Sequence, residues 1–197
     1  MMQEFKKFII ILAMVVGLIL IIFNENIRGY YRFKAICEKE SGLRVYQKLE
    51  QGVGWLADSY SNARYVATIQ GVGFVRYVGQ DGITYDLRYL KGHPGDDTSF
   101  DKKAADLTKP VLYSFKFVLE DIQGELRLAR AGFEIRDVRS LKHDDSMKIS
   151  TAKLVARIYR FDYSRFDQDK TILAAPSRIT CSSYHIETPE NRAQLFK

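Results

Sequence analysis

The pattern of apolar and polar positions divides the chain into one uninterrupted apolar run and a long segment of mixed character. From Phe8 to Phe23 the sequence reads FIIILAMVVGLILIIF and contains no charged residue. A helix of this sequence would have no polar side, unlike a helix that covers the core of a globular domain. We therefore predict a transmembrane anchor at 8–23 that is not cleaved.

The residues on either side of this run are basic and aromatic, as in segments at a membrane–water interface. The predicted interface residues are Lys6, Lys7, Arg28, Tyr30, Tyr31 and Arg32. As a helix the run would measure roughly 24 Å, slightly short of the ~30 Å hydrocarbon core of a bilayer. A buried core helix and a cleaved signal peptide are the alternatives, but the residues after Phe23 offer no small-x-small cleavage site. The predicted organisation is a tail at 1–7, the anchor at 8–23, a juxtamembrane linker at 24–34 and a globular domain at 35–197.

Two cysteines, Cys37 and Cys181, lie near the two ends of this domain. A bond between them would close a loop of roughly 140 residues, which the chain-entropy model values at ~4–5 kcal/mol. Disulfides form in oxidising compartments, so we predict a disulfide and an extracytoplasmic domain. The alternative is a pair of unrelated buried thiols. The basic residues on the two flanks of the anchor are nearly balanced and lean toward a cytoplasm-facing domain, which would have free thiols.

Short runs with β character fill the rest of the chain. The clearest signal is a hairpin, in which residues 73–78 and 83–90 flank a Gly-Gln-Asp-Gly turn. Further strands are predicted at 43–49, 64–69, 111–119, 126–130, 133–138, 154–163 and 179–186, with a short helix at 100–107. We expect a mainly β (α+β) domain, built as an antiparallel sandwich or barrel-like sheet with one or two short helices.

A five-residue echo links two of these regions. Gln51–Trp55 reads QGVGW and Gln70–Phe74 reads QGVGF. The echo could mark two equivalent strand entries, but two copies do not define a repeat architecture, and chance is the favoured explanation. No alternating β-α-β pattern is visible.

Candidate chemistry is sparse, and we assign no catalytic residue and no cofactor. The densest group of metal-binding residue types is His93, Asp96 and Asp97, whose oxygen ligands on a loop would suit calcium. Their spacing matches no EF-hand loop and His is a poor calcium ligand, so the favoured interpretation is a turn rich in Asp and Gly without a metal. An envelope hydrolase or metal-dependent enzyme that uses these residues, or His185, is the alternative function.

Arginine and aromatic residues interleave from Arg157 to Phe166, as they do in platforms for single-stranded nucleic acid. The same pattern arises in a strand that buries one face and exposes cationic residues on the other. The net charge of +6 comes partly from the flanks of the apolar run, so it argues weakly for nucleic acid. We expect no nucleic-acid partner.

Residues 37–46 have the form Cys-x4-Gly-x-Arg-Val-Tyr, and Phe-Glu-Ile-Arg-Asp-Val follows at 133–138, with Leu-Val-Ala at 154–156. The first motif resembles the domain start of small, uncharacterised bacterial envelope proteins that begin with a hydrophobic segment. The later residues are similar to an Ile-x-Asp strand and a Leu-Ala/Val strand in those proteins. The resemblance implies a bacterial envelope setting and carries no activity.

Together these observations predict a non-catalytic, single-pass protein of the bacterial inner membrane. Its contact with the lipid bilayer would lie at 8–23. Its periplasmic domain would bind an envelope protein in an accessory, assembly or exclusion/immunity role.

Overall fold

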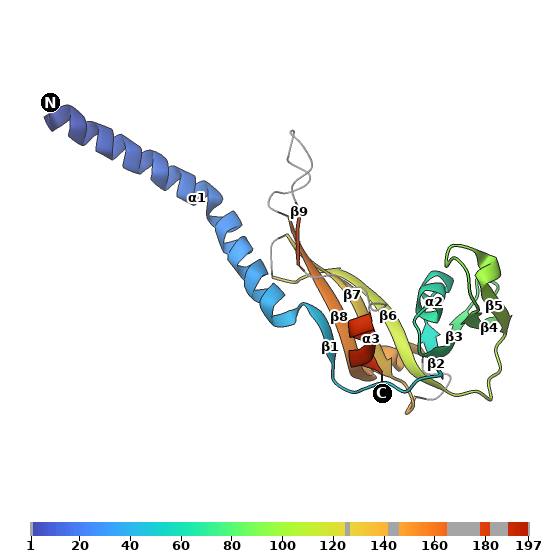
Figure 1. The fold of residues 1–197 in the computed structure, drawn as a ribbon. Helices are drawn as coiled ribbons and strands as arrows, with labels where there is room; N and C mark the ends of the chain where they lie inside the picture. The colour runs from blue at the N-terminus through green and yellow to red at the C-terminus, as the bar shows by residue number, and fades with distance from the viewer. Residues whose placement is uncertain (1, 125–126, 142–145, 165–177, 182–188, 197) are drawn as a thin grey trace.

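A long N-terminal helix joins a β-rich body in the computed structural model of the chain (Figure 1), which describes residues 2–124, 127–141, 146–164, 178–181 and 189–196. The helices are α1 (Met2–Glu40), α2 (Tyr60–Ala67) and α3 (Pro189–Leu195), with short 3₁₀ turns η1 (Asp97–Ser99) and η2 (Ser146–Thr151). The strands are β1 (Gly42–Val45), β2 (Val53–Ala57), β3 (Val72–Val78), β4 (Thr84–Tyr89), β5 (Phe100–Ala104), β6 (Val111–Asp121), β7 (Leu128–Asp137), β8 (Lys153–Ser164) and β9 (Arg178–Cys181).

All of these strands belong to one mixed sheet in the order β1-β8-β7-β6-β2-β3-β4-β5, with β9 also pairing with β8. Strand accounts for 42% of the structure and helix for 33%, so the predicted mainly β character is confirmed. The predicted antiparallel sandwich or barrel-like sheet is wrong, because β2 runs parallel to both β3 and β6. Helices, rather than a second sheet, pack against the two faces.

The five-residue echo marks two neighbouring strands. Val53 of β2 lies in register with Val72 of β3, and the Gly52 N–H donates to the Gly71 carbonyl over 2.6 Å. Helix α2 connects these parallel strands, so the chain contains a β-α-β unit that sequence analysis missed. The echo thus marks two equivalent strand entries, the alternative that sequence analysis had left open.

Close approach of the two strands explains why the echo contains glycine. A Cβ on Gly73 would lie 2.2 Å from the carbonyl oxygen of Gly52. A Cβ on Gly54 would lie 2.3 Å from the ring of Phe74. The obstacle at Gly73 is backbone, so this strand entry requires glycine, whereas at Gly54 a side chain would force the ring of Phe74 to move.

Helix α2 occupies most of the range 64–69 that was predicted as a strand. The Ser59 hydroxyl accepts a hydrogen bond from the Asn62 N–H at 3.2 Å and caps the helix. Ala63 and Val66 are buried on the inner face at helical spacing. Val66 therefore packs as part of a short amphipathic helix, which ends at the C-cap Thr68.

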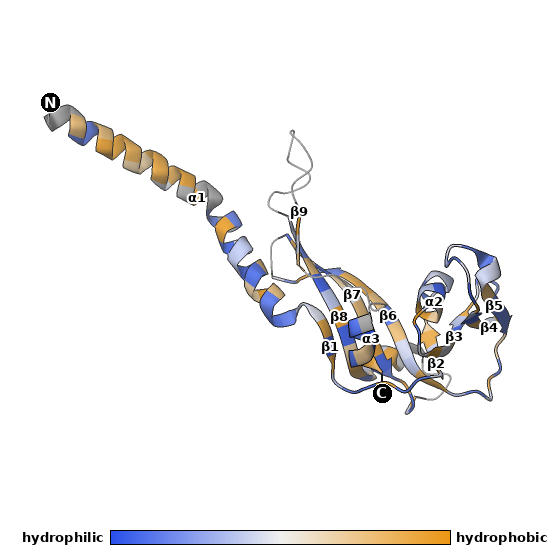
Figure 2. Cartoon of the chain, in the orientation of Figure 1, coloured by the Kyte–Doolittle hydropathy of each residue, from blue (hydrophilic) through white to orange (hydrophobic). Residues whose placement is uncertain are grey.

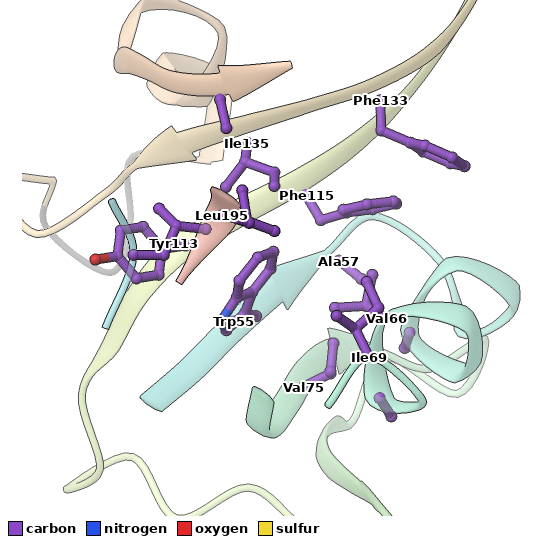
Figure 3. Close-up of a cluster of buried hydrophobic side chains, with 14 of the residues drawn as sticks. Trp55, Ala57, Val66, Ile69, Val75, Tyr113, Phe115, Phe133, Ile135 and Leu195 are labelled. Atoms are coloured by element: carbon purple, nitrogen blue, oxygen red, sulfur yellow. The ribbon is translucent and has the colours of Figure 1, made fainter. Parts of the chain in front are cut away.

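The main hydrophobic core lies between the sheet, α2 and α3 (Figure 3). Trp55 is fully buried at its centre, and Phe115 and Phe133 pack with ring centroids 4.7 Å apart. Each such side chain contributes about 1.5–3 kcal/mol on burial. Leu195 of α3 closes the core, so the C-terminal helix is tied to the body.

The predicted β hairpin is confirmed as β3 and β4, and the strands predicted at 111–119 and 154–163 are confirmed as β6 and β8. The predicted helix at 100–107 is wrong, because Phe100–Ala104 forms β5 against β4. The two strands predicted at 126–130 and 133–138 form one strand, β7, in the part of that range that the structure describes. Residues 182–186 of the last predicted strand lie outside the described residues.

Helix α1 is continuous through the range 24–34 that was predicted as a linker. Among the described residues, no helix is both long and apolar enough to cross a membrane, so the predicted transmembrane helix at 8–23 is wrong. The run has 16 residues, and a span needs about 20.

Candidate functional site

Helix α1 has two halves of different character (Figure 2). The large apolar side chains that the structure describes from Phe8 to Ile21 are each 47–75% exposed, on every side of the helix. From Asn26 to Glu40 the helix packs along β8 instead. We call this second half, with the sheet residues that it contacts, the α1 dock.

The centre of the α1 dock is a second hydrophobic cluster, separate from the main core. Phe33 and Cys37 lie one helical turn apart and face the sheet. The ring of Phe33 stacks on Tyr163 with centroids 5.8 Å apart. The buried members of the cluster are Phe33, Cys37, Leu128, Tyr159, Phe161 and Tyr163.

The N-terminal end of the α1 dock depends on close contact between helix and sheet. A Cβ on Gly29 would lie 2.6 Å from Oη of Tyr163, so glycine lets the helix approach the ring. Tyr163 Oη donates to the Asn26 carbonyl at 3.2 Å, and Arg127 Nη1 donates to the Asn26 side-chain oxygen at 2.6 Å. Arg127 has a φ of 60°, a conformation that costs energy for a side chain of this size.

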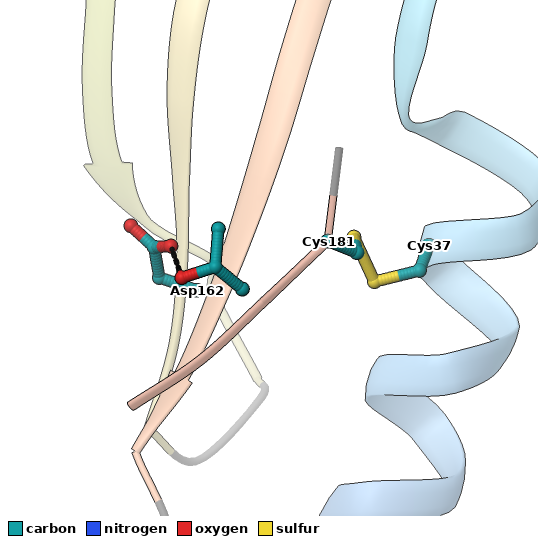
Figure 4. Close-up of a disulfide and its surroundings, with 4 residues drawn as sticks. Cys37, Asp162 and Cys181 are labelled. Carbon is teal, nitrogen blue, oxygen red and sulfur yellow. Dashed lines mark hydrogen bonds between the residues drawn. A yellow bond between two sulfur atoms is a disulfide. The ribbon is translucent and has the colours of Figure 1, made fainter. Parts of the chain in front are cut away.

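A disulfide crosses the middle of the α1 dock (Figure 4). The sulfurs of Cys37 and Cys181 lie 2.08 Å apart with their Cα atoms 6.0 Å apart, so the structure brings together the pair that the sequence predicted. The bond joins α1 to β9. Beside it, the Thr180 hydroxyl donates to Asp162 at 2.7 Å, which holds β9 on β8.

Two arginines hold the C-terminal end of α1. Arg157 of β8 forms an ion pair with Glu40 at 3.1 Å, and Arg44 of β1 donates to the Lys39 carbonyl. Positive charge at this end of a helix is favourable because the last carbonyls carry partial negative charge. The dock is therefore fixed at both ends and in the middle.

A polar network extends from the dock across the same face of the sheet. The guanidinium groups of Arg130 and Arg157 lie 4.6 and 4.7 Å from the ring centroid of Tyr159. Its hydroxyl donates to Glu134, which also accepts from Arg136 at 2.7 Å. Burial and the hydrogen bond to Glu134 raise the pKa of Tyr159 to about 12.

The pKa of Glu134 shifts the other way. Burial acts to raise this pKa, but the hydrogen bonds from Tyr159 and Arg136 outweigh burial and leave it below its usual value. Both pKa values therefore move away from pH 7, so that at this pH Glu134 is a carboxylate and Tyr159 is an uncharged phenol. This arrangement suits a fixed structural contact more than acid–base catalysis.

The described aromatic residues of the Arg157–Phe166 run are buried in the α1 dock. Tyr159, Phe161 and Tyr163 are each 2% exposed. Their rings have no open face on which a base could stack, so the run is a strand that buries its aromatic residues against α1. Residues 165 and 166 lie outside the described residues.

A groove lies on the other side of the sheet, between α2 and the loop after β4. It is a hollow of about 420 Å³ lined by Tyr60, Ser61, Arg64, Tyr65, Thr68, Pro94 and Gly95. Arg64 binds the loop through the Pro94 carbonyl at 2.8 Å and Asp97 at 3.0 Å. Burial and the hydrogen bond to Asp97 raise the pKa of Tyr60. Arginine and tyrosine are the residue types that most often dominate protein–protein contacts.

The metal candidates lie at the edge of this groove, where His93 and Asp97 make hydrogen bonds and an ion pair within the protein. The His93 Nδ1 accepts the Gly95 N–H at 3.0 Å, which closes a turn. Asp97 is engaged by Tyr60 at 3.0 Å and by Arg64. Within the described ranges, no three His, Cys, Asp or Glu side chains gather as a metal site, Asp96 included. His185 lies outside the described residues.

The predicted membrane-interface residues all lie on α1. Lys6 and Lys7 precede the exposed apolar half, and Arg28, Tyr30, Tyr31 and Arg32 follow it as exposed residues of the docked half. The structure leaves their role as interface residues a prediction.

Sequence analysis missed the residues that make the dock, apart from the cysteines. Asn26 and Gly29 lie in the range 24–34 that was predicted as a linker, so neither was given a packing role. If that range had been predicted as a helix, the glycine inside it would have been the one local signal of close packing.

Comparison with known proteins adds no relative. No protein-family model matches the chain, and neither a curated protein nor a solved structure is similar to it. The resemblance to envelope proteins therefore stays a prediction from the sequence motifs.

Proposed function

We propose that this protein is a non-enzymatic binding protein of an oxidising, extracytoplasmic compartment of a bacterial envelope. Residues 8–23 of α1 contact lipid, and the β-rich body holds an envelope protein partner. The observation that carries the proposal is the division of α1 into an exposed apolar half and a docked half.

The exposed half supports the lipid contact. Monomeric proteins in water rarely leave a continuous apolar patch of more than a few hundred Å² uncovered. A helix that is apolar on every side suits lipid better than one face of a partner protein, which would cover one side only. Lys6 and Lys7 before it and Arg28 after it complement anionic headgroups.

The disulfide and the dock support the setting and the role. The Cys37–Cys181 bond is consistent with an oxidising compartment. The dock holds α1 rigidly on β8, so the body is presented in a fixed orientation. Figure 1 shows the N-terminus of α1 and strands β4 and β5 at opposite ends of the molecule. The α2 groove near β5 therefore lies away from the lipid contact, where a partner can reach it.

Vesicle flotation tests the lipid contact. Full-length chain is mixed with vesicles of phosphatidylethanolamine and phosphatidylglycerol, and the variant Ile10→Asp/Leu18→Asp is compared with wild type. Ile83→Asp is the matched control, since Ile83 is 51% exposed against 58% and 59% for Ile10 and Leu18 but lies in the body. We expect wild type and Ile83→Asp to float with the vesicles and the α1 variant to remain in the unbound fraction. Flotation of the α1 variant, or failure of wild type because α1 self-associates instead, would overturn the lipid contact.

Crosslinking in living cells tests the partner. A photoreactive p-benzoylphenylalanine replaces Ser61, which is exposed in the α2 groove, or Lys48, which is exposed elsewhere on the body. We expect one heterologous adduct of defined mass from position 61 and none from position 48. Equal adducts from both positions, or none from either, contradict the proposed partner surface. Cysteine mass-tagging in the same cells should label Cys37 and Cys181 only after reduction.

A further inference from the structure

Strand β5 is an open edge of the sheet. Among the described strands, only β4 pairs with β5. At the other edge of the sheet, α1 is bonded to β9 through the disulfide. In Figure 1, β5 lies at the end of the body far from the N-terminus of α1. An edge strand offers unpaired N–H and C=O groups to any extended chain that fits it.

The register with β4 shows which backbone groups point outward. The Leu90 N–H donates to the Ser99 carbonyl and the Ala105 N–H to the Thr84 carbonyl, both at 2.9 Å. Hydrogen-bonded pairs alternate along an antiparallel ladder, so residues 99, 101, 103 and 105 bond to β4. The backbone groups of Lys102 and Ala104 and the carbonyl of Phe100 therefore face away from the sheet, whereas the Phe100 N–H donates to the Asp97 carbonyl.

On one face of the sheet, charges alternate in sign from strand to strand up to this edge. Arg76 of β3 pairs with Asp86 of β4, and Asp86 stands opposite Lys103 of β5. In the next row, Arg88 of β4 stands opposite Asp101 of β5. Lys103 Nζ also donates to Asp101 at 2.7 Å within the strand, so the edge presents a positive and a negative charge that are paired with each other, two residues apart on the same face.

We propose that β5 pairs antiparallel with β5 of a second copy of this chain, about a two-fold axis through Lys102. In this register the two Lys102 residues exchange backbone hydrogen bonds, and the Ala104 N–H of each copy donates to the Phe100 carbonyl of the other. Asp101 then stands opposite Lys103 of the second copy, twice, at non-hydrogen-bonded positions where side chains approach most closely. An interface of this symmetry is self-complementary.

The alternation of charge continues across this junction. A row that begins with Arg76, Asp86 and Lys103 is completed by Asp101 and Arg88 of the second copy. Five successive strands then carry charges of alternating sign, and the two-fold axis repeats the row in the opposite direction. Exposed lysines on an edge strand normally discourage pairing. Asp101, placed two residues from Lys103, makes the edge selective for its own sequence.

The two Lys102 side chains are the one like-charged pair that this register creates. The ammonium group of Lys102 lies 3.8 Å from the ring centroid of Tyr85 and 6.0 Å from those of Tyr60 and Tyr77. The charge is therefore directed over the rings of its own copy and away from the axis. Cation–π contact of this kind stabilises the charge where it lies.

The association should be weak, because a pair of five-residue strands buries much less than the ~1,200–2,000 Å² of a standard stable interface. Confinement at a lipid surface would raise the effective concentration of the two copies. The pairing itself does not depend on the lipid contact.

Charge exchange with photo-crosslinking tests the pairing in the full-length chain, solubilised in a non-ionic detergent. Ala104 is replaced by p-benzoylphenylalanine, and the charge variants are Asp101→Lys and Lys103→Asp. Lys48→Asp, on the far side of the body, is the matched control. We expect wild type and Lys48→Asp to give a covalent dimer in which position 104 is linked to the peptide that contains Phe100. Each charge variant alone should lose most of this product, at least about fivefold.

An equimolar mixture of the two charge variants should restore the dimer, because the lysine introduced at 101 then faces the aspartate introduced at 103. Mixing cannot repair a misfolded chain, so the rescue separates pairing from damage to β5 itself. The proposal is overturned if wild type gives no crosslink from position 104, if dimers link only through α1, or if the mixture stays as low as the separate variants. Flotation is unaffected by these substitutions, so failure here leaves the lipid contact standing.

Discussion

The substitution Gly29→Ala tests whether α1 is held in direct contact with the sheet. Alanine is ordinarily more favourable than glycine inside a helix by about 1 kcal/mol. Here a Cβ at position 29 would lie 2.6 Å from Oη and 3.0 Å from Cζ of Tyr163. The ring cannot easily turn aside, because it is buried, stacks on Phe33 and donates a hydrogen bond to Asn26.

The expected effect follows from these two opposing contributions. Forcing an extra methyl group into a packed site costs about 1–3 kcal/mol. Helix propensity returns about 1 kcal/mol, so Gly29→Ala should lower the free energy of unfolding by about 1 kcal/mol. Gly17→Ala is the matched control in the same helix, since nothing lies within 4 Å of a Cβ there. We expect it to cause no loss.

Urea unfolding of the full-length chain in non-ionic detergent measures these changes through the fluorescence of Trp55, the single tryptophan, which is buried in the core. In a Tyr163→Phe background the clash with the hydroxyl is removed, so Gly29→Ala should cost less, with a coupling energy of about 1 kcal/mol. If Gly29→Ala raises the free energy of unfolding by about 1 kcal/mol in both backgrounds, as propensity alone predicts, the close contact is refuted.

Three further predictions concern the cross-links of the fold. Replacing Cys37 and Cys181, which are 144 residues apart, by serine should lower the free energy of unfolding by about 5 kcal/mol in denaturant titrations, and a loss below about 1 kcal/mol would contradict the chain-entropy reasoning. Arg76→Met leaves the Asp86 carboxylate, whose side chain is only 12% exposed, without the guanidinium that binds it at 2.8 and 2.9 Å, so thermal unfolding should show a loss of about 3 kcal/mol. The pKa of Tyr159 is raised from 10.0 to about 12 by burial and its hydrogen bond to Glu134. Its protonated hydroxyl therefore stabilises the folded state fully below pH 10, and this stabilisation is lost as the pH rises toward 12. In a plot of the free energy of unfolding against pH, Tyr159→Phe should remove this decrease between pH 10 and 12. If the decrease persists in the variant, it arises from another group.

Sequence patterns located the elements whose signals are local. The β3–β4 hairpin was predictable because the turn residues Gly79–Gly82 and both alternating runs lie within a few positions of each other. The disulfide was predictable because two cysteines allow only one pairing. Strand β8 carried enough β-branched and aromatic residues to be recognised alone.

Elements decided by distant partners were not predictable in this way. Phe100, Ala104 and Leu107 have helical spacing, so residues 100–107 were predicted as a helix. Pairing with β4 overrides that spacing, since Asp101 and Lys103 stand opposite Arg88 and Asp86. Helix α2 was missed although its signal is local. Its N-cap, Ser59, lies five residues before the range 64–69 that was predicted as a strand.

The dock was hidden because its parts are far apart in sequence. Asn26 meets Arg127 across 101 positions, and Glu134 meets Tyr159 across 25. Such contacts leave no local spacing to read, and only the glycine at position 29 hinted at one. The echo at 51–55 and 70–74 was visible, but its cause, two glycine-bearing strands in close parallel contact, required the register.

The dock and the open edge lie at opposite ends of one hydrogen-bonded sheet. Six strand spacings separate β8 from β5, which amounts to about 29 Å at ~4.8 Å per strand. A sheet of that width fixes the relative orientation of its two edges. A small displacement at one edge does not reach the other, because each strand is held by its own hydrogen bonds to its neighbours. Gly29→Ala should therefore leave the crosslink from position 104 unchanged in detergent, and Asp101→Lys should leave flotation unchanged. If either substitution affects the other end, the sheet couples the two sites and is not the passive spacer that its hydrogen bonding implies.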